Sequence, residues 1–521
     1  MARGRSRGTS RGTSRRTPPR AADRGRQARL GKPPERSKFA RPLWSAAVLG
    51  VVVGFLAVAL LTRLGAVDQA APTPDPEVLA RTEPAALPPP KGLGLPDLEA
   101  SVVVAEPLPP SRADAAAVEQ VVNTLVDRRK VLGRRVHVAV AGLDGTPLVS
   151  VGSGTFIPAS ITKLLTATAA TDGLARGTRF ATTAVLEGRT GPRPLLHLVG
   201  GGDPLLASTP DAGPSDLPVA DLATLAEQSA RNLAAAGVQT VRLRYDSSLF
   251  AGDGRNDAWP ASYYFGVVAP ITALSVDQGR TAGFGDEADP PATAAGVFAG
   301  ELRAAGLKVR GAPRPSDGLA AAAEAGRTED VGQVQSAPVD RLVRHMLEVS
   351  DNVVAETLAH QLALATGRTP DFAGAAEATE ASLRRLGVPL EGLRLRDASG
   401  LSRLNRIDSQ TVLGVLEAAS SAERPELRPV LTDLPVAGFT GSLAGRYLDA
   451  PDAGLGTVRA KTGTLTGVHG LAGTVVDRDG TEMLFVAVAD RVRVPQTLAA
   501  RDLLALMTAR LAACRCGAAA G

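Results

Sequence analysis

Ser160 and Lys163 are the first residues of this 521-residue chain whose types and spacing could carry out chemistry. Residues three apart share one face of a helix. A serine hydroxyl is a weak nucleophile until a base takes its proton, and a desolvated lysine can be that base without a histidine. Ser160 follows Pro158, so it would lie in a first helical turn, where free N–H groups favour negative charge. Taken alone, the same spacing also describes a capping serine and a surface lysine.

A second motif, Ser350-Asp351-Asn352, stands between two stretches with helical apolar spacing. Ser350 could relay a proton between Lys163 and a leaving group, and Asn352 could hydrogen-bond a substrate amide. A turn of this composition is also an ordinary helix cap.

The third motif, Lys461-Thr462-Gly463-Thr464, falls on a strand predicted within 458–476. Gly463 has no side chain, so a substrate backbone could approach the strand there. The N–H groups of Thr464 and Ser160 would form an oxyanion hole, and Lys461 would attract a substrate carboxylate. Only seven lysines occur beside 51 arginines. Two of the seven stand in these motifs, which indicates a need for an ammonium that can lose its proton or for a compact one.

In this order the motifs resemble those of the class C low-molecular-mass penicillin-binding proteins, the D-alanyl-D-alanine carboxypeptidase/endopeptidases. Four further segments are similar to that family: Pro158 to Leu165, the glycine-rich 198–204, Asp397-Ala-Ser-Gly-Leu-Ser-Arg403 and Leu434-Pro-Val-Ala-Gly438. The resemblance covers about residues 113–513. It implies a discontinuous α/β domain of the β-lactamase/transpeptidase type, a serine acyl-transferase with an inserted domain.

The resemblance also implies a reaction on peptidoglycan stem peptides. Ser160 would attack the penultimate D-Ala carbonyl, D-Ala would leave, and water would hydrolyse the acyl-enzyme; β-lactams would acylate the same serine and stay. The catalytic residues would be Ser160, Lys163, Ser350 and Asn352, and the substrate-binding residues Lys461, Thr462, Gly463 and Thr464. No cofactor, metal or nucleic-acid partner is expected.

Three other functions use or imitate the same motifs. A DD-endopeptidase would have the same site and cleave a different bond. A β-lactamase would deacylate penicillin quickly, but it has a much shorter segment than the one between Lys163 and Ser350. A non-catalytic wall-binding protein would be expected to have lost Lys163 or Lys461, and both are present.

The elements that must position these residues follow from apolar spacing. Helices are predicted over 114–131 and 496–513, and strands over 136–140, 147–151, 458–476 and 484–489. Helices at both ends with strands inside them predict one sheet built from both ends of the chain. The resemblance, together with the long segment between Lys163 and Ser350, implies an acyl-transferase domain at 113–185 and 335–513, interrupted by an insert at 186–334, with a tail at 514–521.

The N-terminal part has a different composition. Residues 1–42 are basic and nearly devoid of large apolar side chains, which predicts a disordered cytoplasmic tail. Residues 43–62 contain an uncharged apolar run long enough to span a bilayer, with positive charge before it. A Pro-rich linker, 63–112, follows. These features predict a single-pass cell-membrane protein with an extracytoplasmic catalytic domain, the alternative being a cleaved signal peptide.

Cysteine and histidine usage adds little. The two cysteines, Cys514 and Cys516, cannot form a disulfide framework, and we expect no role for them in a short tail. The five histidines are scattered, without metal-ligand spacing.

Overall fold

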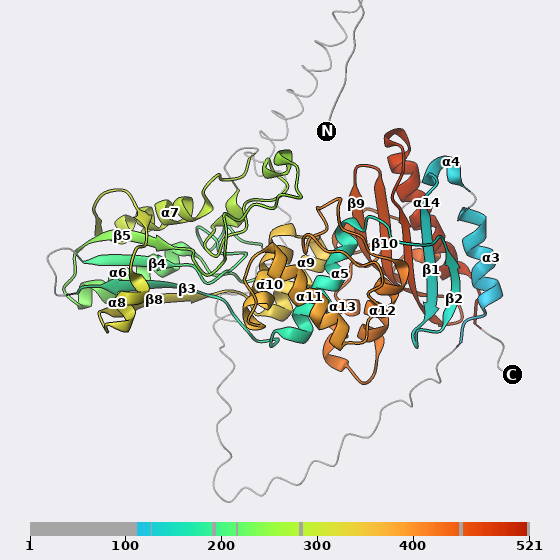
Figure 1. Cartoon of the computed structure of the whole chain (residues 1–521), viewed down its shortest axis with the longest axis horizontal. Coiled ribbons are helices and arrows are strands. Elements are labelled where there is room, and N and C mark those ends of the chain that lie inside the picture. Colours follow the sequence, from blue (N-terminus) through green and yellow to red (C-terminus); the bar gives the residue numbers. More distant parts are fainter. Residues whose placement is uncertain are drawn as a thin grey trace, which may run out of the picture. The chain divides into compact units, whose positions relative to one another are not determined.

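The computed structural model describes residues 112–126, 128–189, 194–214, 217–280, 285–447 and 452–517 (Figure 1). The predicted tail 1–42, the predicted membrane span 43–62 and all but the last residue of the linker lie outside them. Among the described residues, no helix combines the length and apolar character needed to cross a membrane.

Strands from both ends of the described chain form one antiparallel sheet, in the order β2-β1-β11-β10-β9. The strands are β1 (Val136–Gly142), β2 (Pro147–Val151), β9 (Val458–Leu465), β10 (Val468–Val476) and β11 (Glu482–Ala489). Because β1 pairs with β11, the two ends of the domain close a single sheet, as the sequence predicts. The predicted strand 458–476 is a hairpin, since Gly467, at φ 76°, takes the left-handed conformation of a tight turn.

Helices pack on both faces of this sheet. On one face α3 (Ala115–Val126) and α14 (Thr497–Ala513) cover an apolar cluster that includes Val138 and Phe485. One helix was predicted over 114–131. The structure has two in its place, α3 and the short α4 (Arg129–Leu132). The other face contacts α12 (Ser409–Ser420) and α13 (Pro429–Thr432). Four further helices share one apolar cluster with them and with this face: α5 (Thr162–Gly173), α9 (Val339–Val349), α10 (Asn352–Ala365) and α11 (Phe372–Arg385).

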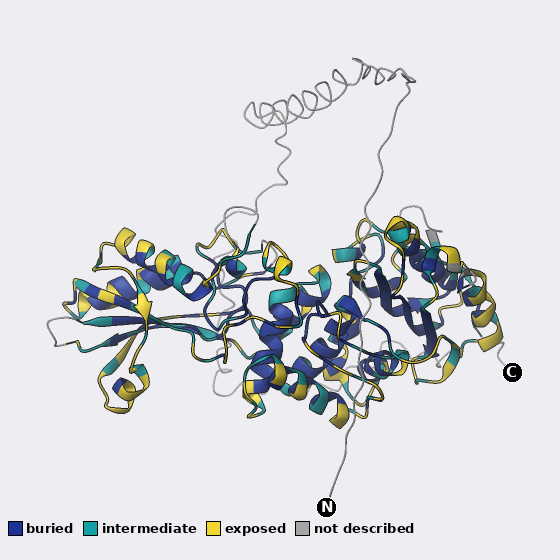
Figure 2. Ribbon diagram, turned by 45° about the horizontal axis from the view of Figure 1, so that its top comes forward, coloured by how far each residue is buried: buried dark blue, intermediate teal, exposed yellow. Residues whose placement is uncertain are grey.

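Helix α5 lies at the centre of the second layer. Its residues from Thr162 to Ala170 are all buried, so it is enclosed by protein on every side. Figure 2 shows the central strands of the sheet as mostly buried. The residues at the start of α5 are therefore held by a rigid support.

The segment between α5 and α9 builds a second sheet, in the order β6-β5-β4-β3-β8, with β7 pairing β5. Its strands are β3 (Ala181–Glu187), β4 (Leu195–Val199), β5 (Thr240–Asp246), β6 (Lys308–Val309), β7 (Arg314–Pro315) and β8 (Thr328–Gln335); its helices are α6 (Leu222–Ala235), α7 (Pro290–Ala304) and α8 (Leu319–Glu324). Helices α6 and α7 share an apolar core with one face of this sheet. The predicted boundary at residue 186 falls inside β3, so the unit that we call the inserted domain begins with Ala181 and ends with Gln335.

The C-terminal segment, predicted to be a tail without a role, is part of the fold up to Gly517. Cys514 and Cys516 form a disulfide, and Cys516 is fully buried. Its N–H donates to Asp477 Oδ2, while its carbonyl accepts from the N–H of Asp114. These bonds tie the end of α14 to the start of α3, which the spacing of the two cysteines could not indicate.

Candidate active site

Ser160 lies in a 3₁₀ turn (Ala159–Ile161) that leads directly into α5. The turn contains Ala159 at φ 48°, a left-handed conformation that costs a non-glycine residue about 1 kcal/mol or more. Gly400 makes the conformation possible by close packing, because a Cβ there would lie 1.9 Å from the carbonyl oxygen of Ala159. Tertiary packing thus places the serine, partly exposed, at the start of a buried helix.

Lys163 lies one turn further along α5 and is fully buried. Its Nζ donates to three oxygens: Ser160 Oγ at 3.2 Å, Asn352 Oδ1 at 2.8 Å and the backbone oxygen of Ser399 at 2.7 Å. The ammonium and the serine hydroxyl are therefore within hydrogen-bond distance. The three acceptors come from segments far apart in the sequence.

Burial lowers the pKa of Lys163 to about 8, although the charges of Glu356, Asp397 and Asp351 oppose this shift. A lysine with this pKa is neutral in about one molecule in ten at pH 7, against far fewer for an ordinary lysine. Its neutral amine can accept the proton of the adjacent serine. The environment thus gives Lys163 the basic character that its spacing from Ser160 predicts.

The Ser350-Asp351-Asn352 motif is the junction between α9 and α10, as predicted. Ser350 ends α9 in the left-handed conformation, at φ 64°. Asp351 caps α10 by accepting from the N–H of Val354 at 3.0 Å, which makes Asn352 the first residue of that helix. The sharp turn directs Ser350 and Asn352 to the two lysines of the other motifs.

Lys461, like Lys163, is a buried lysine beside a serine hydroxyl, here that of Ser350 at the junction of α9 and α10. It is fully buried on β9, and its Nζ lies 2.8 Å from Ser350 Oγ and 3.2 Å from the carbonyl oxygen of Thr462. Burial, and then the charge of Lys163, hold its pKa well below the ordinary range. Two buried lysines therefore face two serine hydroxyls in one site.

Strand β9 is an edge strand, and its first residues are covered. Ala437 donates to Val458 O, and Ala460 donates to Pro435 O. Because backbone groups alternate in direction along a strand, the N–H groups of Thr462 and Thr464 point to the same, outer edge. An extended peptide could add to β9 there as a further strand.

Gly463 has a different purpose from the one expected. A Cβ at this position would lie 2.8 Å from the carbonyl oxygen of Pro158 and 3.1 Å from Ile161 Cγ1. The missing side chain therefore lets the turn that carries Ser160 pack on β9. We expected the missing side chain to leave space for a substrate. That expectation is wrong, because a Cβ at Gly463 would point at the serine turn.

A cavity of about 270 Å³ lies beside the helix junction. Ser350 and Asn352 line it together with residues that come from the loops after β5, among them Val267, Gln278 and Arg280. Asn352 Nδ2 donates to Val267 O at 3.2 Å, and Gln278 Nε2 donates to Asp351 at 2.5 Å. The long segment between the first two motifs thus supplies part of the wall of the site.

Glu356, which no sequence motif had singled out, lies on α10 and is fully buried. Its carboxylate accepts from the N–H groups of Ala398 and Ser399, and so holds the Ser399 carbonyl that accepts from Lys163. Burial and the neighbouring Asp397 raise its pKa to about 8. An acidic residue four positions after Asn352, inside an apolar helix, is the signal that could have identified it.

Asp397 organises the segment that contains Ser399. It accepts from Trp259 Nε1 at 2.7 Å, from Asn405 Nδ2 at 2.6 Å and from the N–H groups of Gly400 and Ser402. The sequence shows this segment only as a likeness to the family, without a role for the aspartate.

Replacing Glu356 with glutamine is expected to move the pH profile of acylation by penicillin to lower pH. The amide keeps an oxygen for the two N–H groups but removes the carboxylate charge that raises the pKa of Lys163. Because the pKa of Glu356 is itself about 8, this charge is present mainly at and above that pH, and the shift is expected in that part of the profile. Acylation rates measured between pH 5 and 10 test this, with the exposed Glu377→Gln on the neighbouring helix as control. A profile that stays in place would show that Glu356 does not act on Lys163 through its charge.

Comparison with known proteins identifies one family. The model of the D-Ala-D-Ala carboxypeptidase 3 (S13) family matches residues 117–284 and 286–511. Carboxypeptidase DacB of Mycolicibacterium smegmatis is 35% identical over 428 residues, which are 79% of this chain and 90% of that protein. The D-alanyl-D-alanine carboxypeptidase of Actinomadura sp. strain R39 is 29% identical over 440 residues, 69% of this chain and 78% of that one.

Solved structures agree on the fold. The crystal structure of penicillin binding protein 4 from Haemophilus influenzae superposes with a TM-score of 0.60 at 20% identity, over 76% of this chain and 98% of that one. A second structure of that protein, complexed with a novel β-lactam, gives a TM-score of 0.56 at 21% identity over the same shares.

Proposed function

The chain belongs to the D-Ala-D-Ala carboxypeptidase 3 (S13) family, and on that premise we propose that its buried two-lysine site catalyses the removal of the terminal D-Ala from peptidoglycan stem peptides. The activity is that of a serine-type D-Ala-D-Ala carboxypeptidase, a hydrolase. The observation that carries the assignment of the residues is the 3.2 Å distance between Lys163 Nζ and Ser160 Oγ.

In acylation, Ser160 Oγ attacks the carbonyl carbon of the penultimate D-Ala while Lys163 takes the hydroxyl proton. The negative charge on the carbonyl oxygen is stabilised by the N–H groups of Ser160 and Thr464. As the C–N bond breaks, the proton that Lys163 took passes through Ser350 to the leaving amine, and Lys163 becomes neutral again. Lys461 Nζ, 2.8 Å from Ser350 Oγ, orients this hydroxyl. Water then attacks the ester, Ser160 regains its proton, and the shortened peptide leaves.

Asn352 and the edge of β9 hold the substrate in this proposal. The Asn352 amide lies between Lys163 and the cavity beside the helix junction, where it can bond a peptide group of the substrate. Thr462 and Thr464 present backbone groups to the same peptide, with Gly463 keeping the strand against the serine turn. A β-lactam, which mimics the D-Ala-D-Ala end, would acylate Ser160 in the same way. The Haemophilus influenzae protein, which shares the fold, is solved in complex with a β-lactam.

Release of D-Ala from a tripeptide that ends in D-Ala-D-Ala tests the proposal directly. A DD-endopeptidase would instead cleave a cross-linked dimer of stem peptides faster than the monomer, so both substrates are measured at equal concentration. Faster cleavage of the dimer would favour the endopeptidase.

Replacing Lys461 with alanine is expected to impair a peptide with a free terminal carboxylate more than its amidated counterpart. The ammonium is close to the scissile bond in this proposal, and a charge-assisted hydrogen bond of this kind contributes about 1.5–3 kcal/mol, roughly tenfold or more in kcat/KM. The measurement is the ratio of kcat/KM for the two peptides in both proteins, with Lys308→Arg as an exposed control. An unchanged ratio would limit Lys461 to proton transfer at Ser350.

We also propose that the chain is a single-pass membrane protein with its N-terminus in the cytoplasm and the site outside. The support is the apolar run within 43–62 and the positive charge before it. The Pro-rich composition of 63–112 suits a spacer that keeps catalysis independent of the membrane.

Deleting residues 1–64 is therefore expected to release an active protein from the membrane fraction. The described domain begins well after this segment, so D-Ala release should stay within about twofold of the full chain. Deletion of residues 1–42 alone serves as the control and should leave the protein in the membrane fraction. Membrane association that survives the longer deletion would contradict the anchor at 43–62.

A further inference from the structure

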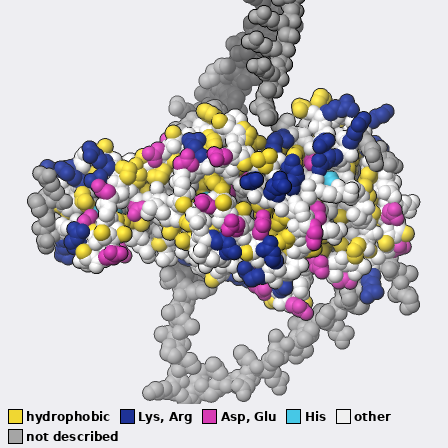
Figure 3. Space-filling model, in the orientation of Figure 1, with side chains coloured by type: hydrophobic (Ala, Val, Ile, Leu, Met, Phe, Trp, Pro, Cys, Tyr) yellow, Lys and Arg dark blue, Asp and Glu magenta, His cyan; other side chains and the backbone are white. Residues whose placement is uncertain are grey.

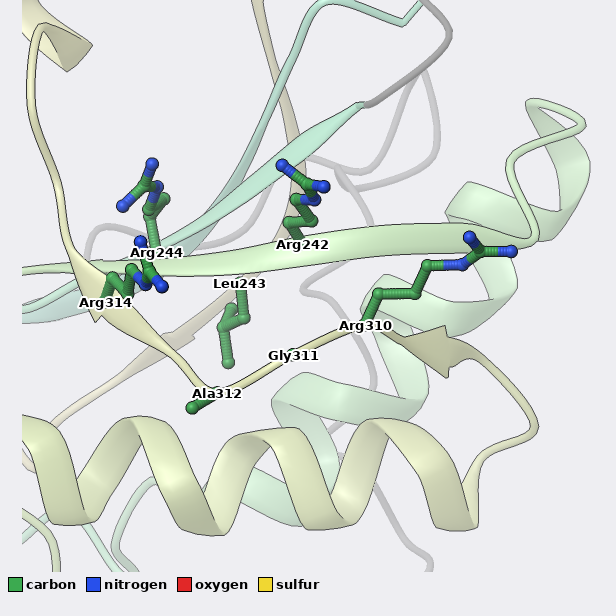
Figure 4. A pocket seen from close by; sticks show the side chains of 7 residues that line it. All are labelled: Arg242, Leu243, Arg244, Arg310, Gly311, Ala312 and Arg314. Atoms are coloured by element: carbon green, nitrogen blue, oxygen red, sulfur yellow. The ribbon is translucent and has the colours of Figure 1, made fainter.

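Four arginines surround a cavity of about 250 Å³ in the inserted domain, far in sequence from every catalytic motif. Arg242 and Arg244 lie on β5, Arg314 on β7, and Arg310 just after β6. We call these four residues the arginine cluster. Figure 4 shows the guanidinium groups of Arg242 and Arg244 on the side of β5 away from α7, and those of Arg310 and Arg314 beside that strand. Figure 3 shows several Lys and Arg side chains over the same end of the molecule, with acidic side chains among them.

The alternation of β5 puts the arginines on the face of the sheet that α6 and α7 leave uncovered. Val241 and Leu243 point to the helices and belong to the buried core of the inserted domain. Arg242 and Arg244, between and after them, point to the opposite face. The core therefore fixes the backbone that carries two of the four charges.

The cluster concentrates positive charge without matching negative charge. Arg244 and Arg314 are direct partners in the pairing of β5 with β7, and like charges opposite each other destabilise a sheet. No acidic residue is among the described residues that line the cavity. The nearest pairing is loose, since Asp317, with its side chain 82% exposed, lies 3.8 Å from Arg244.

Neighbouring acidic side chains on the same face already have other hydrogen-bond or ion-pair partners. Glu187 accepts from His197 Nε2 at 3.2 Å and pairs with Arg327 at the same distance. Asp246 accepts from the N–H of Ser248 in the turn that follows β5. Among the described residues, none forms an ion pair with Arg242, Arg310 or Arg314 that would offset the repulsion.

We propose that the arginine cluster binds the phosphodiester groups of an anionic polymer outside the active site. Arginine presents a planar fork of N–H donors that matches the oxygens of phosphate. One phosphodiester carries a single charge, so four arginines suit a chain of such groups better than one isolated ion. A polymer held here would keep the enzyme beside its insoluble substrate, because the inserted domain and the acyl-transferase domain belong to one chain.

The proposal is tested with the full chain in detergent by calorimetric titration with a short inorganic polyphosphate. The test variant is Arg242→Gln with Arg310→Gln, two side chains without an ion pair among the described residues. The control variant is Arg189→Gln with Arg231→Gln, two exposed arginines of the inserted domain that pair with Glu329 and Glu227. The basic N-terminal segment contributes equally to all three proteins.

The test variant is expected to bind polyphosphate at least tenfold more weakly than the unaltered chain, since removing one charge-assisted hydrogen bond reduces affinity by about tenfold. The control should stay within about twofold. Equal binding by the test and control variants would overturn the proposal.

Two further probes separate phosphate polymers from other anions. Poly-γ-glutamate of matched length is expected to bind more weakly than polyphosphate, and equal binding would assign the cluster to carboxylates instead. Vesicles of phosphatidylglycerol and phosphatidylcholine should show no difference between test and control variants; a difference confined to vesicles would make the cluster a membrane contact. Penicillin labelling of Ser160, expected to be equal in all variants, reports separately on the proposed catalytic site.

Discussion

Replacing Ser160 with alanine is expected to abolish covalent labelling by fluorescent penicillin and to reduce D-Ala release by about 10⁴-fold or more. The change removes only the attacking oxygen. Lys163 keeps two of its three acceptors, Asn352 Oδ1 and the carbonyl of Ser399, so the buried ammonium stays hydrogen-bonded. The measurements are the stoichiometry of labelling and the rate of D-Ala release.

The matched control is Ser153→Ala, an exposed serine in the loop after β2. It should label and hydrolyse like the unaltered chain. Thermal unfolding of both variants checks that the fold is intact. A Ser160→Ala protein that labels at the usual stoichiometry would place the nucleophile elsewhere and would remove the basis for the proposed mechanism.

The second large effect is expected for Lys163→Arg, which should slow acylation by about 10²–10⁴-fold although the positive charge is kept. A guanidinium does not lose its proton in a protein, so it cannot accept the proton of Ser160. The rate constant for penicillin acylation, measured at saturating and limiting concentrations, tests this. Near-normal acylation would make Lys163 a purely structural or electrostatic partner.

Because the Lys163 side chain is fully buried, the larger arginine could also disturb packing. Lys163→Met, which is neutral and of similar length, separates the two effects. It should fold, as judged by thermal unfolding, and should acylate as slowly as the arginine variant. Rapid acylation by either variant would contradict the role of Lys163 as the base.

The pH dependence follows from the same residue. With a pKa of about 8, Lys163 is protonated in acid and gains basic character as the pH rises. Acylation should therefore increase with pH, by roughly tenfold per unit well below this pKa, and level off above it. The Lys163→Met variant should lose this limb, which distinguishes titration of Lys163 from titration of the substrate.

Local patterns in the amino-acid sequence were enough to find the three motifs and to predict the elements around them, while the resemblance to the family implied the inserted domain. Apolar alternation in 136–140 and 147–151 predicted β1 and β2, and the spacing in 496–513 predicted α14, because each pattern matches the period of its element. The three motifs also identified Ser160, Lys163, Ser350, Asn352 and Lys461. The scarcity of lysine in the chain made the two lysines stand out. The predicted limit at residue 186 fell inside β3, because the alternation of side chains along a strand does not show which sheet the strand joins.

How these residues meet depends on the packing of distant segments, which the folded chain alone reveals. Lys163 donates to Asn352 and Ser399, which lie about 190 and 240 positions further along the chain, and no local pattern encodes such pairs. Glu356 was missed, and Asp397 was given no role, for the same reason: what gives each its place in the site is burial and hydrogen bonding to distant segments. Gly463 was assigned to the substrate because a missing side chain shows only that something approaches. The fold shows that the approaching group is the turn that carries Ser160, since the direction of a Cβ depends on how β9 packs.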